Sequence, residues 1–206
     1  MLKSNDYESV LIDKDIIDFL RVAYFGTNTD IFQSASTRAY LDMCRTIRFN
    51  GFEENERLKL REEVTKTFKM KFKDLNSNSI NTQDDFDNWH MNLCDEIIDI
   101  YNARNINLTY GQAQKWINMT IKYLYVLGVE NFENVFQFLH IPVDNYIINK
   151  AKKLFNIKKP ILPRSRWNDY DNQYLKYQKE LRSKIKDYSP LRWEFKNWII
   201  ASRDKG

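Results

Sequence analysis

Residues that break helices are scarce in this chain, with 5 glycines and 4 prolines among 206 residues. A β-sandwich or barrel of this length needs many tight turns, and tight turns depend on glycine and proline. Apolar residues recur instead at helical spacing, as in Leu60, Val64, Phe68, Phe72 and Leu75. No segment shows a persuasive alternating strand pattern. The sequence therefore predicts an all-α protein of eight or nine helices.

The length and composition predict one soluble domain over residues 1–206, built as two helical lobes that share a core. Hydrophobic residues make up 43% of the chain and charged residues 29%, a balance typical of globular proteins. Residues 156–166 form the one clear linker. It contains two prolines and a group of basic side chains, namely Lys158, Lys159, Arg164 and Arg166.

Several classes of function are disfavoured by what the sequence lacks. Two cysteines and two histidines cannot make a zinc site of the usual spacing or an iron–sulfur cluster. No glycine-rich phosphate loop is present, so no nucleotide cofactor is expected. No apolar run is long enough for a bilayer span, and acids stand where a signal peptide needs apolar residues. We expect a reduced, cytoplasmic protein without a structural metal, a cofactor or a membrane partner; its oligomeric state stays open.

The positions of caps and apolar stripes predict where the helices lie. Thr82 and Thr109 can each begin a helix, and Pro142 can open another that continues to Phe155. His90 is expected to pack on a helix face, and His140 to cap a helix. The other helices are expected at 15–25, 30–49, 55–75, 130–139, 167–185 and 190–203. The residues expected in the core include Ile117, Ile121, Leu124 and Phe155.

The helix that follows Thr109 has two distinct faces. Ala113, Ile117, Ile121 and Leu124 share an apolar face, whereas Lys115, Met119 and Lys122 share another. Taken alone, Lys115 is an ordinary exposed lysine near a helix start. Asp144, two residues after Pro142, is likewise an ordinary acid at the start of a helix.

The order of three segments carries more information than any one of them. AQKWINMTIKY, then IPVDNYI, then PLRWEFKNW together resemble the helix–hairpin–helix DNA glycosylase superfamily, and most closely its archaeal branch that removes 8-oxoguanine. Two lysines seven residues apart, an Ile-Pro-x-Asp segment, and a Pro-Leu followed by an acid and a tryptophan four apart are typical of that branch. The matching residues here are Lys115 and Lys122; Ile141, Pro142 and Asp144; and Pro190, Leu191, Glu194 and Trp198.

The resemblance covers residues 109–155 and 189–200, which is under a third of the chain. The chain departs from the family pattern at two points. The hairpin glycines are reduced to Gly111, and the acid before the tryptophan is Glu194 where the family has aspartate. The first hundred residues have no recognisable counterpart.

The resemblance implies a two-lobed helical fold and an enzyme that removes a damaged or modified base, without a cofactor, and that can also cleave the strand. Lys115 would attack the sugar, with a neighbouring cation such as Lys122 favouring its neutral form. Asp144 would stabilise the charge that develops on the sugar. Trp198 and Met119 would flank the flipped base, and Glu194 would accept a hydrogen bond from it.

The expected partner is double-stranded DNA. The resemblance implies that Gly111 and Gln112 contact the DNA backbone, and the charge of Lys158, Lys159 and Arg164 would hold phosphates without reading sequence. The formal net charge of +4 is compatible with DNA binding but does not point to it.

Two other functions remain open. The chain could be a catalytically silent protein of the same fold that binds DNA or protein, or an unrelated helical interaction module whose aromatic stripes are only core. Geometry discriminates between enzyme and module, because an enzyme needs Lys115 and Asp144 in one cleft.

Overall fold

The computed structural model describes residues 14–49, 51–77 and 79–203, and all regular structure within these ranges is helical. The prediction of an all-α protein is confirmed for this part of the chain. Short 3-10 turns occupy Cys44–Thr46, Phe72–Asn76 and Arg164–Arg166. The α-helices are α1 (Lys14–Phe25), α2 (Ile31–Leu41), α3 (Glu54–Lys71), α4 (Gln83–Asn102), α5 (Tyr110–Val126), α6 (Asn145–Phe155), α7 (Lys176–Lys184) and α8 (Pro190–Arg203).

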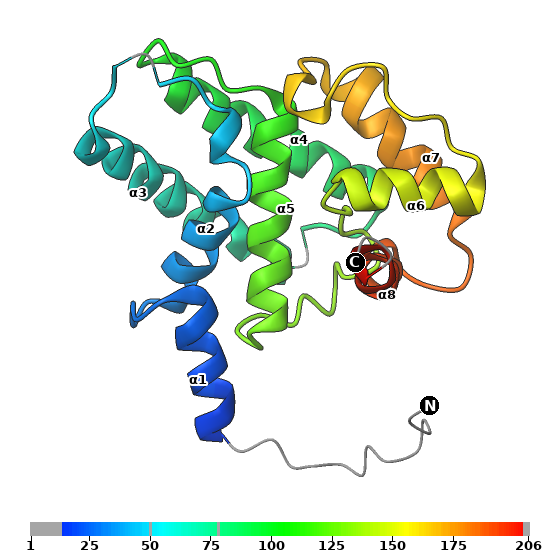
Figure 1. Ribbon diagram of the computed structural model, residues 1–206, viewed down its shortest axis with the longest axis horizontal. Coiled ribbons are helices and arrows are strands. Elements are labelled where there is room, and N and C mark those ends of the chain that lie inside the picture. The colour runs from blue at the N-terminus through cyan, green and yellow to red at the C-terminus, as the bar shows by residue number, and fades with distance from the viewer. Residues whose placement is uncertain (1–13, 50, 78, 204–206) are drawn as a thin grey trace.

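Helix α5 runs through the middle of the molecule, with α2 and α3 on one side of it and α6, α7 and α8 on the other (Figure 1). Its predicted apolar face is confirmed, because Ile117, Ile121 and Leu124 are buried. Trp116 is also buried and donates a hydrogen bond from its indole nitrogen to the Ser36 carbonyl oxygen at 3.0 Å. This bond and the packing of α2 along α5 fix the two helices together.

Side-chain caps explain where the central helices begin. The Thr82 hydroxyl accepts the Asp85 amide and the Asp85 carboxylate accepts the Thr82 amide, a reciprocal capping box that starts α4. Thr109 and Gln112 make the same arrangement at the start of α5. Both starts agree with the predictions from the sequence.

Four predicted helix boundaries are wrong. Helix α6 begins at Asn145 rather than at Pro142, because the Asp144 carboxylate caps it by accepting the Ile147 amide. Residues 130–139 form turns instead of a helix, with a left-handed backbone at Phe132. The segment expected as a helix over 30–49 ends at Leu41 and gives way to a 3-10 turn, and 167–185 divides into the π-helical turn Tyr170–Leu175 and α7.

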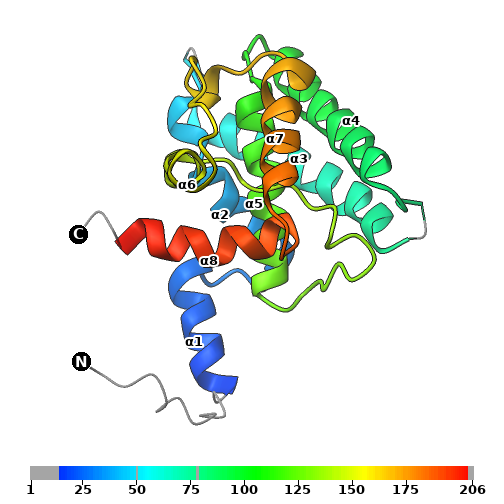
Figure 2. The ribbon, with the colours of Figure 1, turned by 90° about the vertical axis from the view of Figure 1, so that its right-hand side faces the viewer.

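Phe155 is half-buried rather than fully buried, because it lies at the last turn of α6 and stacks on Trp193 of α8. Helix α1 extends away from the other helices in both ribbon views (Figures 1 and 2). None of its residues is buried, although Tyr24 near its end reaches the cleft described below. No helix in the described ranges is long and apolar enough to cross a bilayer.

Candidate active site

A cleft of about 750 Å³ lies between α5 and α8 and extends to the ends of α1 and α2. A pocket of this size is in the range that small-molecule sites occupy. The predicted catalytic and base-binding residues all line it, although they come from three separate parts of the sequence. They are Lys115, Met119, Asp144, Glu194 and Trp198; Lys122, expected as a neighbouring cation, also lines the cleft.

Lys115 is half-buried in this cleft, and no side chain in the described part of the chain pairs with its amine through a hydrogen bond or an ion pair. Burial lowers the pKa of Lys115, and the charge of Arg164 lowers it further, against the opposing charges of Asp144 and Asp42. The cations that favour the neutral amine are therefore Arg164 and, to a smaller extent, Arg45, whereas the sequence pointed to Lys122.

Lys122 has a different setting, because its amine is already paired. It lies 2.7 Å from Glu194 Oε1 and 5.0 Å from the centre of the Phe195 ring. Burial raises the pKa of Glu194, whose second oxygen, Oε2, has no hydrogen-bond partner among the described residues. A buried carboxylate oxygen without a donor is costly, so Glu194, which lines the cleft, retains unused acceptor capacity.

Asp144 joins α6 to α8 through its two carboxylate oxygens. Oδ1 accepts the Ile147 amide at 2.9 Å, and Oδ2 accepts the indole N–H of Trp198 at 2.9 Å. The interpretation of Asp144 as an acid at the start of a helix is therefore correct, since Asp144 caps α6. The same side chain lines the cleft together with Lys115, so capping and a role in the cleft are compatible.

The opposite wall of the cleft holds polar residues that the sequence analysis missed. Tyr123 donates a hydrogen bond to Asp42 Oδ2 at 2.5 Å, and Arg38 lies 3.6 Å from Asp42 Oδ1. The Arg38 guanidinium also lies 4.5 Å from the centre of the Tyr24 ring. Asp42 and Tyr123 are 81 residues apart in sequence. No local spacing could reveal this cluster, because it exists only once α2 packs against α5.

The two hairpin residues expected to contact DNA are engaged within the protein. The Gly111 amide donates to the Trp167 carbonyl oxygen at 3.0 Å, and the Gln112 amide is used in the cap of α5. Both residues are buried. Their amides are therefore not free to hold a DNA phosphate in this arrangement.

The three basic residues predicted to bind phosphates fall into two groups. Lys158 and Lys159 are exposed in the linker and line neither the cleft nor the recess beside Lys115. Arg164 is half-buried beside Lys115 and donates to Asn145 Oδ1 at 2.8 Å. Only Arg164 is thus brought next to the candidate nucleophile.

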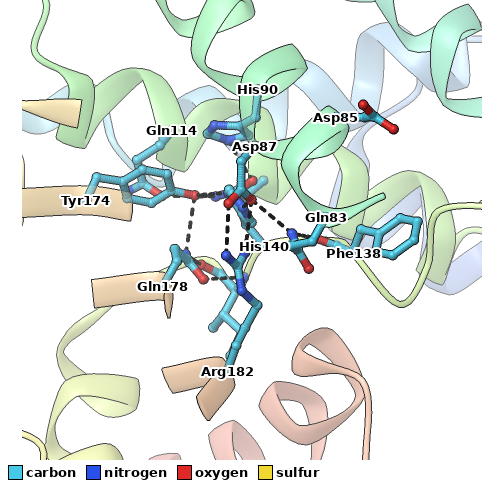
Figure 3. A network of polar contacts seen from close by, with 12 residues as sticks. Gln83, Asp85, Asp87, His90, Gln114, Phe138, His140, Tyr174, Gln178 and Arg182 are labelled. Atoms are coloured by element: carbon cyan, nitrogen blue, oxygen red, sulfur yellow. Dashed lines mark hydrogen bonds and ion pairs between the residues drawn. The ribbon is translucent and has the colours of Figure 1, made fainter. Parts of the chain in front are cut away.

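A buried polar network lies behind the cleft and was not foreseen from the sequence (Figure 3). Asp87 is at its centre, and Arg182 donates to both of its carboxylate oxygens, at 3.0 and 2.9 Å. His140 Nε2 donates to Asp87 Oδ1 at 2.7 Å, and its Nδ1 accepts from Tyr174 at 2.8 Å. His140 is therefore not a helix cap as predicted, because both of its ring nitrogens are used inside the core.

The charges of this network are settled by its hydrogen bonds. Burial opposes ionisation of Asp87, yet the hydrogen bonds from His140 and Arg182 hold the pKa of that carboxyl far below its usual range. Burial lowers the pKa of His140, so the imidazole is neutral. His90 packs in the core as expected and is hydrogen-bonded to Tyr170 and Asn118.

The network also fixes the segment that carries Asp144. The Gln178 side chain accepts the Ile141 amide at 3.2 Å and donates to the Ile141 carbonyl oxygen at 2.7 Å, next to His140. Residues 140–144 are thus held at one end by the network and at the other by the cap of α6. A carboxylate on a fixed segment is suited to act on a reacting centre without reorganising.

Comparisons with family models, with curated proteins and with solved structures find no significant match to this chain. The described residues also contain no cluster of three or more histidine, cysteine or carboxylate side chains that could hold a metal ion.

Proposed function

We propose that this protein is a DNA glycosylase that flips a damaged or modified base out of the duplex and removes it with Lys115 as the nucleophile. The observation that carries the proposal is the shared cleft: the Lys115 amine, which has no hydrogen-bond or ion-pair partner among the described residues, and a fixed carboxylate, Asp144, line the same cavity. The proposed enzyme needs these two groups in one cleft.

The chemistry follows from the neutral amine. The Lys115 nitrogen forms a bond to C1′ of the sugar while the bond from C1′ to the base breaks, and the base leaves with the electron pair and takes up a proton. The attached amine then loses a proton, the C1′–O4′ bond breaks as the nitrogen lone pair forms a C=N bond, and O4′ leaves with the electron pair and takes up a proton, which opens the sugar ring to a protonated Schiff base. Asp144 lies where a carboxylate can stabilise the positive charge that develops on the sugar. The Schiff base in turn permits cleavage of the strand.

The walls of the cleft suit a planar base that carries N–H donors. Trp198 and Met119 offer apolar surface on which a flipped base can stack, which offsets the few kcal/mol that unstacking costs. Glu194 lines the cleft, and its buried Oε2 has no donor among the described residues, so we propose that this side chain turns to accept a hydrogen bond from the base. Both features agree with an 8-oxoguanine-like substrate.

The arrangement of helices is compatible with the two-lobed glycosylase type. Lys115 and Met119 lie on α5, whereas Glu194 and Trp198 lie on α8, on the other side of the cleft. We propose that the two sides correspond to the two lobes and that the DNA strand enters between them.

Borohydride trapping tests the proposal directly, because it converts a Schiff base into a stable protein–DNA adduct. Duplex oligonucleotides with a panel of oxidised and modified bases should give an adduct with the wild-type protein on at least one substrate. Lys115→Gln should abolish it. Lys152→Gln is a matched control, since Lys152 is an exposed lysine of α6 that does not line the cleft.

Two results would overturn the assignment. If the wild-type protein traps none of the substrates, the enzyme proposal fails and a helical binding module becomes the better description. If Lys115→Gln traps as well as wild type, another amine is the nucleophile.

A further inference from the structure

A second, smaller recess of about 260 Å³ adjoins the cleft on the side of Lys115. We call it the side recess. Asp42, Arg45 and Lys115 line both cavities, so the Lys115 amine lies at their junction. The other polar side chains of the side recess are Thr46, Gln112, Asn145, Arg164 and Ser165.

Positive charge is in excess in the side recess. Arg45 and Arg164 contribute two guanidinium cations, in addition to the Lys115 amine, against the single carboxylate of Asp42. That carboxylate is already engaged by the Tyr123 hydroxyl and by Arg38. The recess therefore presents uncompensated positive charge beside the reactive amine, which favours an anionic ligand.

Arg164 is the most informative of these cations. Its guanidinium is half-buried, donates to Asn145 Oδ1, and forms no ion pair with a carboxylate in the described ranges. Burial lowers the pKa of Arg164, which is the sign of a charge that the protein alone does not compensate. A planar guanidinium with N–H groups to spare matches the geometry of a phosphate.

The backbone holds Arg164 in place before any ligand arrives. Its carbonyl oxygen lies so close to Gly111 that a side-chain carbon there would be 1.6 Å away, so no larger residue fits. Thr109 donates to the Ser165 carbonyl oxygen at 2.9 Å, and the Gly111 amide donates to that of Trp167. The turn Arg164–Arg166 is therefore fastened to the start of α5, and Arg164 is preorganised.

We propose that the side recess binds one phosphate group of the DNA strand, the one next to the sugar that Lys115 attacks, with Arg164 and Arg45 as its ligands. This inference rests on the proposed function and adds the position of the strand. The base enters the main cleft, the sugar lies at the junction beside Lys115, and the phosphate occupies the side recess. The arginine side chains thus replace the hairpin amides, which are engaged within the protein.

Neutral phosphate substitution tests the proposal linkage by linkage. The probe is a duplex with a tetrahydrofuran abasic analogue, which cannot be excised, and with single phosphodiesters replaced by methylphosphonates. Wild-type protein should lose roughly 10-fold in affinity at one linkage beside the analogue, as expected for a charge-assisted hydrogen bond. Arg164→Gln should bind the parent duplex about 10-fold more weakly than wild type. Methylphosphonate substitution at the sensitive linkage should lower its affinity by less than a further twofold. The slope of log affinity against log salt concentration should be smaller by about one.

Controls separate the side recess from general charge. Arg48→Gln removes an exposed arginine that lines neither cavity, and it should keep the full loss at the sensitive linkage. Arg45→Gln should reduce that loss as Arg164→Gln does, and a melting curve verifies that each variant folds. The proposal would be overturned if the affinity losses from Arg164→Gln and from the methylphosphonate were additive, or if every linkage gave the same loss of affinity.

Inorganic phosphate distinguishes a free anion from the DNA strand. If it displaces the duplex from wild type but not from Arg164→Gln, and no linkage is sensitive, the side recess is a site for free phosphate and the strand assignment is wrong. The trapping assay reports separately on the proposed enzyme. If Arg164→Gln removes the sensitivity at one linkage but no adduct is trapped, the phosphate site is supported and the enzyme is rejected. If an adduct is trapped but Arg164→Gln does not remove that sensitivity, the enzyme is supported and the phosphate site is rejected.

Discussion

The indole N–H of Trp198 donates a hydrogen bond to Asp144 Oδ2 at 2.9 Å, so the residue expected to stack on the base also orients the carboxylate beside Lys115. The bond ties α8 to the cap of α6. In the proposed enzyme this single contact would couple base recognition to the carboxylate beside Lys115.

Trp198→Phe keeps an aromatic ring but removes this donor. The Asp144 carboxylate loses one of its two anchors, so we expect the single-turnover excision rate to fall roughly 10-fold while DNA affinity changes little. Trp193→Phe is the matched control, because Trp193 lies on the same helix but packs in the core against Phe155. It should lower stability and leave the rate constant of the folded protein unchanged; the reverse pattern would contradict the role of Trp198.

Asp144→Asn separates the charge of Asp144 from its function as a cap. Asparagine caps helices about as well as aspartate, so the free energy of unfolding should change by about 1 kcal/mol or less. Excision should slow by about 10²–10³-fold, because a neutral amide does not stabilise a developing cation. Asp42→Asn tests the opposite wall of the cleft. Loss of excision in Asp42→Asn together with normal excision in Asp144→Asn would assign the role to Asp42.

Lys115→Gln should abolish trapping without harming the fold. A half-buried ammonium that has no ion-pair partner among the described residues is more stable in the unfolded chain than in the cleft, as the lowered pKa of Lys115 indicates. Its replacement by a neutral side chain should therefore raise the free energy of unfolding at neutral pH, which chemical denaturation measures. A marked loss of stability would show that Lys115 supports the fold instead.

The pH dependence of kcat/KM should follow the ionisation of Lys115. Only the neutral amine is a nucleophile, so the rate should rise with pH and level off above a pKa that lies below the ordinary lysine value of 10.5. Arg164→Gln removes a cation that favours the neutral amine, so its midpoint should move to higher pH. An unchanged midpoint would mean that Arg164 does not act on Lys115.

Asp87→Asn should be the most destabilising of these changes. It leaves the Arg182 charge without its buried partner, for which about 3–5 kcal/mol is typical. The stabilisation from Asp87 is present above the ordinary aspartate pKa of about 3.9 and is lost as pH falls through the lower pKa of the folded state. In urea unfolding, the free energy of unfolding of Asp87→Asn should therefore fall less steeply than that of wild type as the pH is lowered into the acid range. Asp187→Asn, a control at an exposed site, should behave like wild type.

The sequence was most informative where helical periodicity and local caps decide the structure. The two faces of α5 were predicted correctly, because burial follows a 3.6-residue period, and Thr82 and Thr109 were recognised because a cap needs only its neighbours. The five predicted catalytic and base-binding residues meet in one cleft because α6 and α8 pack against each other beside α5. Predicting that these residues meet required the family resemblance, since no local pattern relates Lys115 to Trp198.

Long-range polar contacts were the part that the sequence could not provide. His140 was expected to cap a helix because it precedes Pro142, yet its partners Asp87 and Tyr174 are 53 and 34 residues away. Gly111 was interpreted as a hairpin glycine, whereas its lack of a side chain admits the Arg164 carbonyl. In both cases tertiary contacts decide the role, and they are invisible to spacing along the chain.

The buried contact between Asp87 and Arg182 also bears on how the chain reaches its fold. The two residues are 95 positions apart in sequence. Their contact forms only after most of the chain has been synthesised, and contacts over such a separation form slowly. Until α7 is in place, the buried Asp87 carboxylate lacks the Arg182 cation that compensates its charge, so packing of α4 against α5 is less favourable in a partly synthesised chain. We therefore expect nascent N-terminal portions to stay open during synthesis, with compaction following emergence of the C-terminal helices.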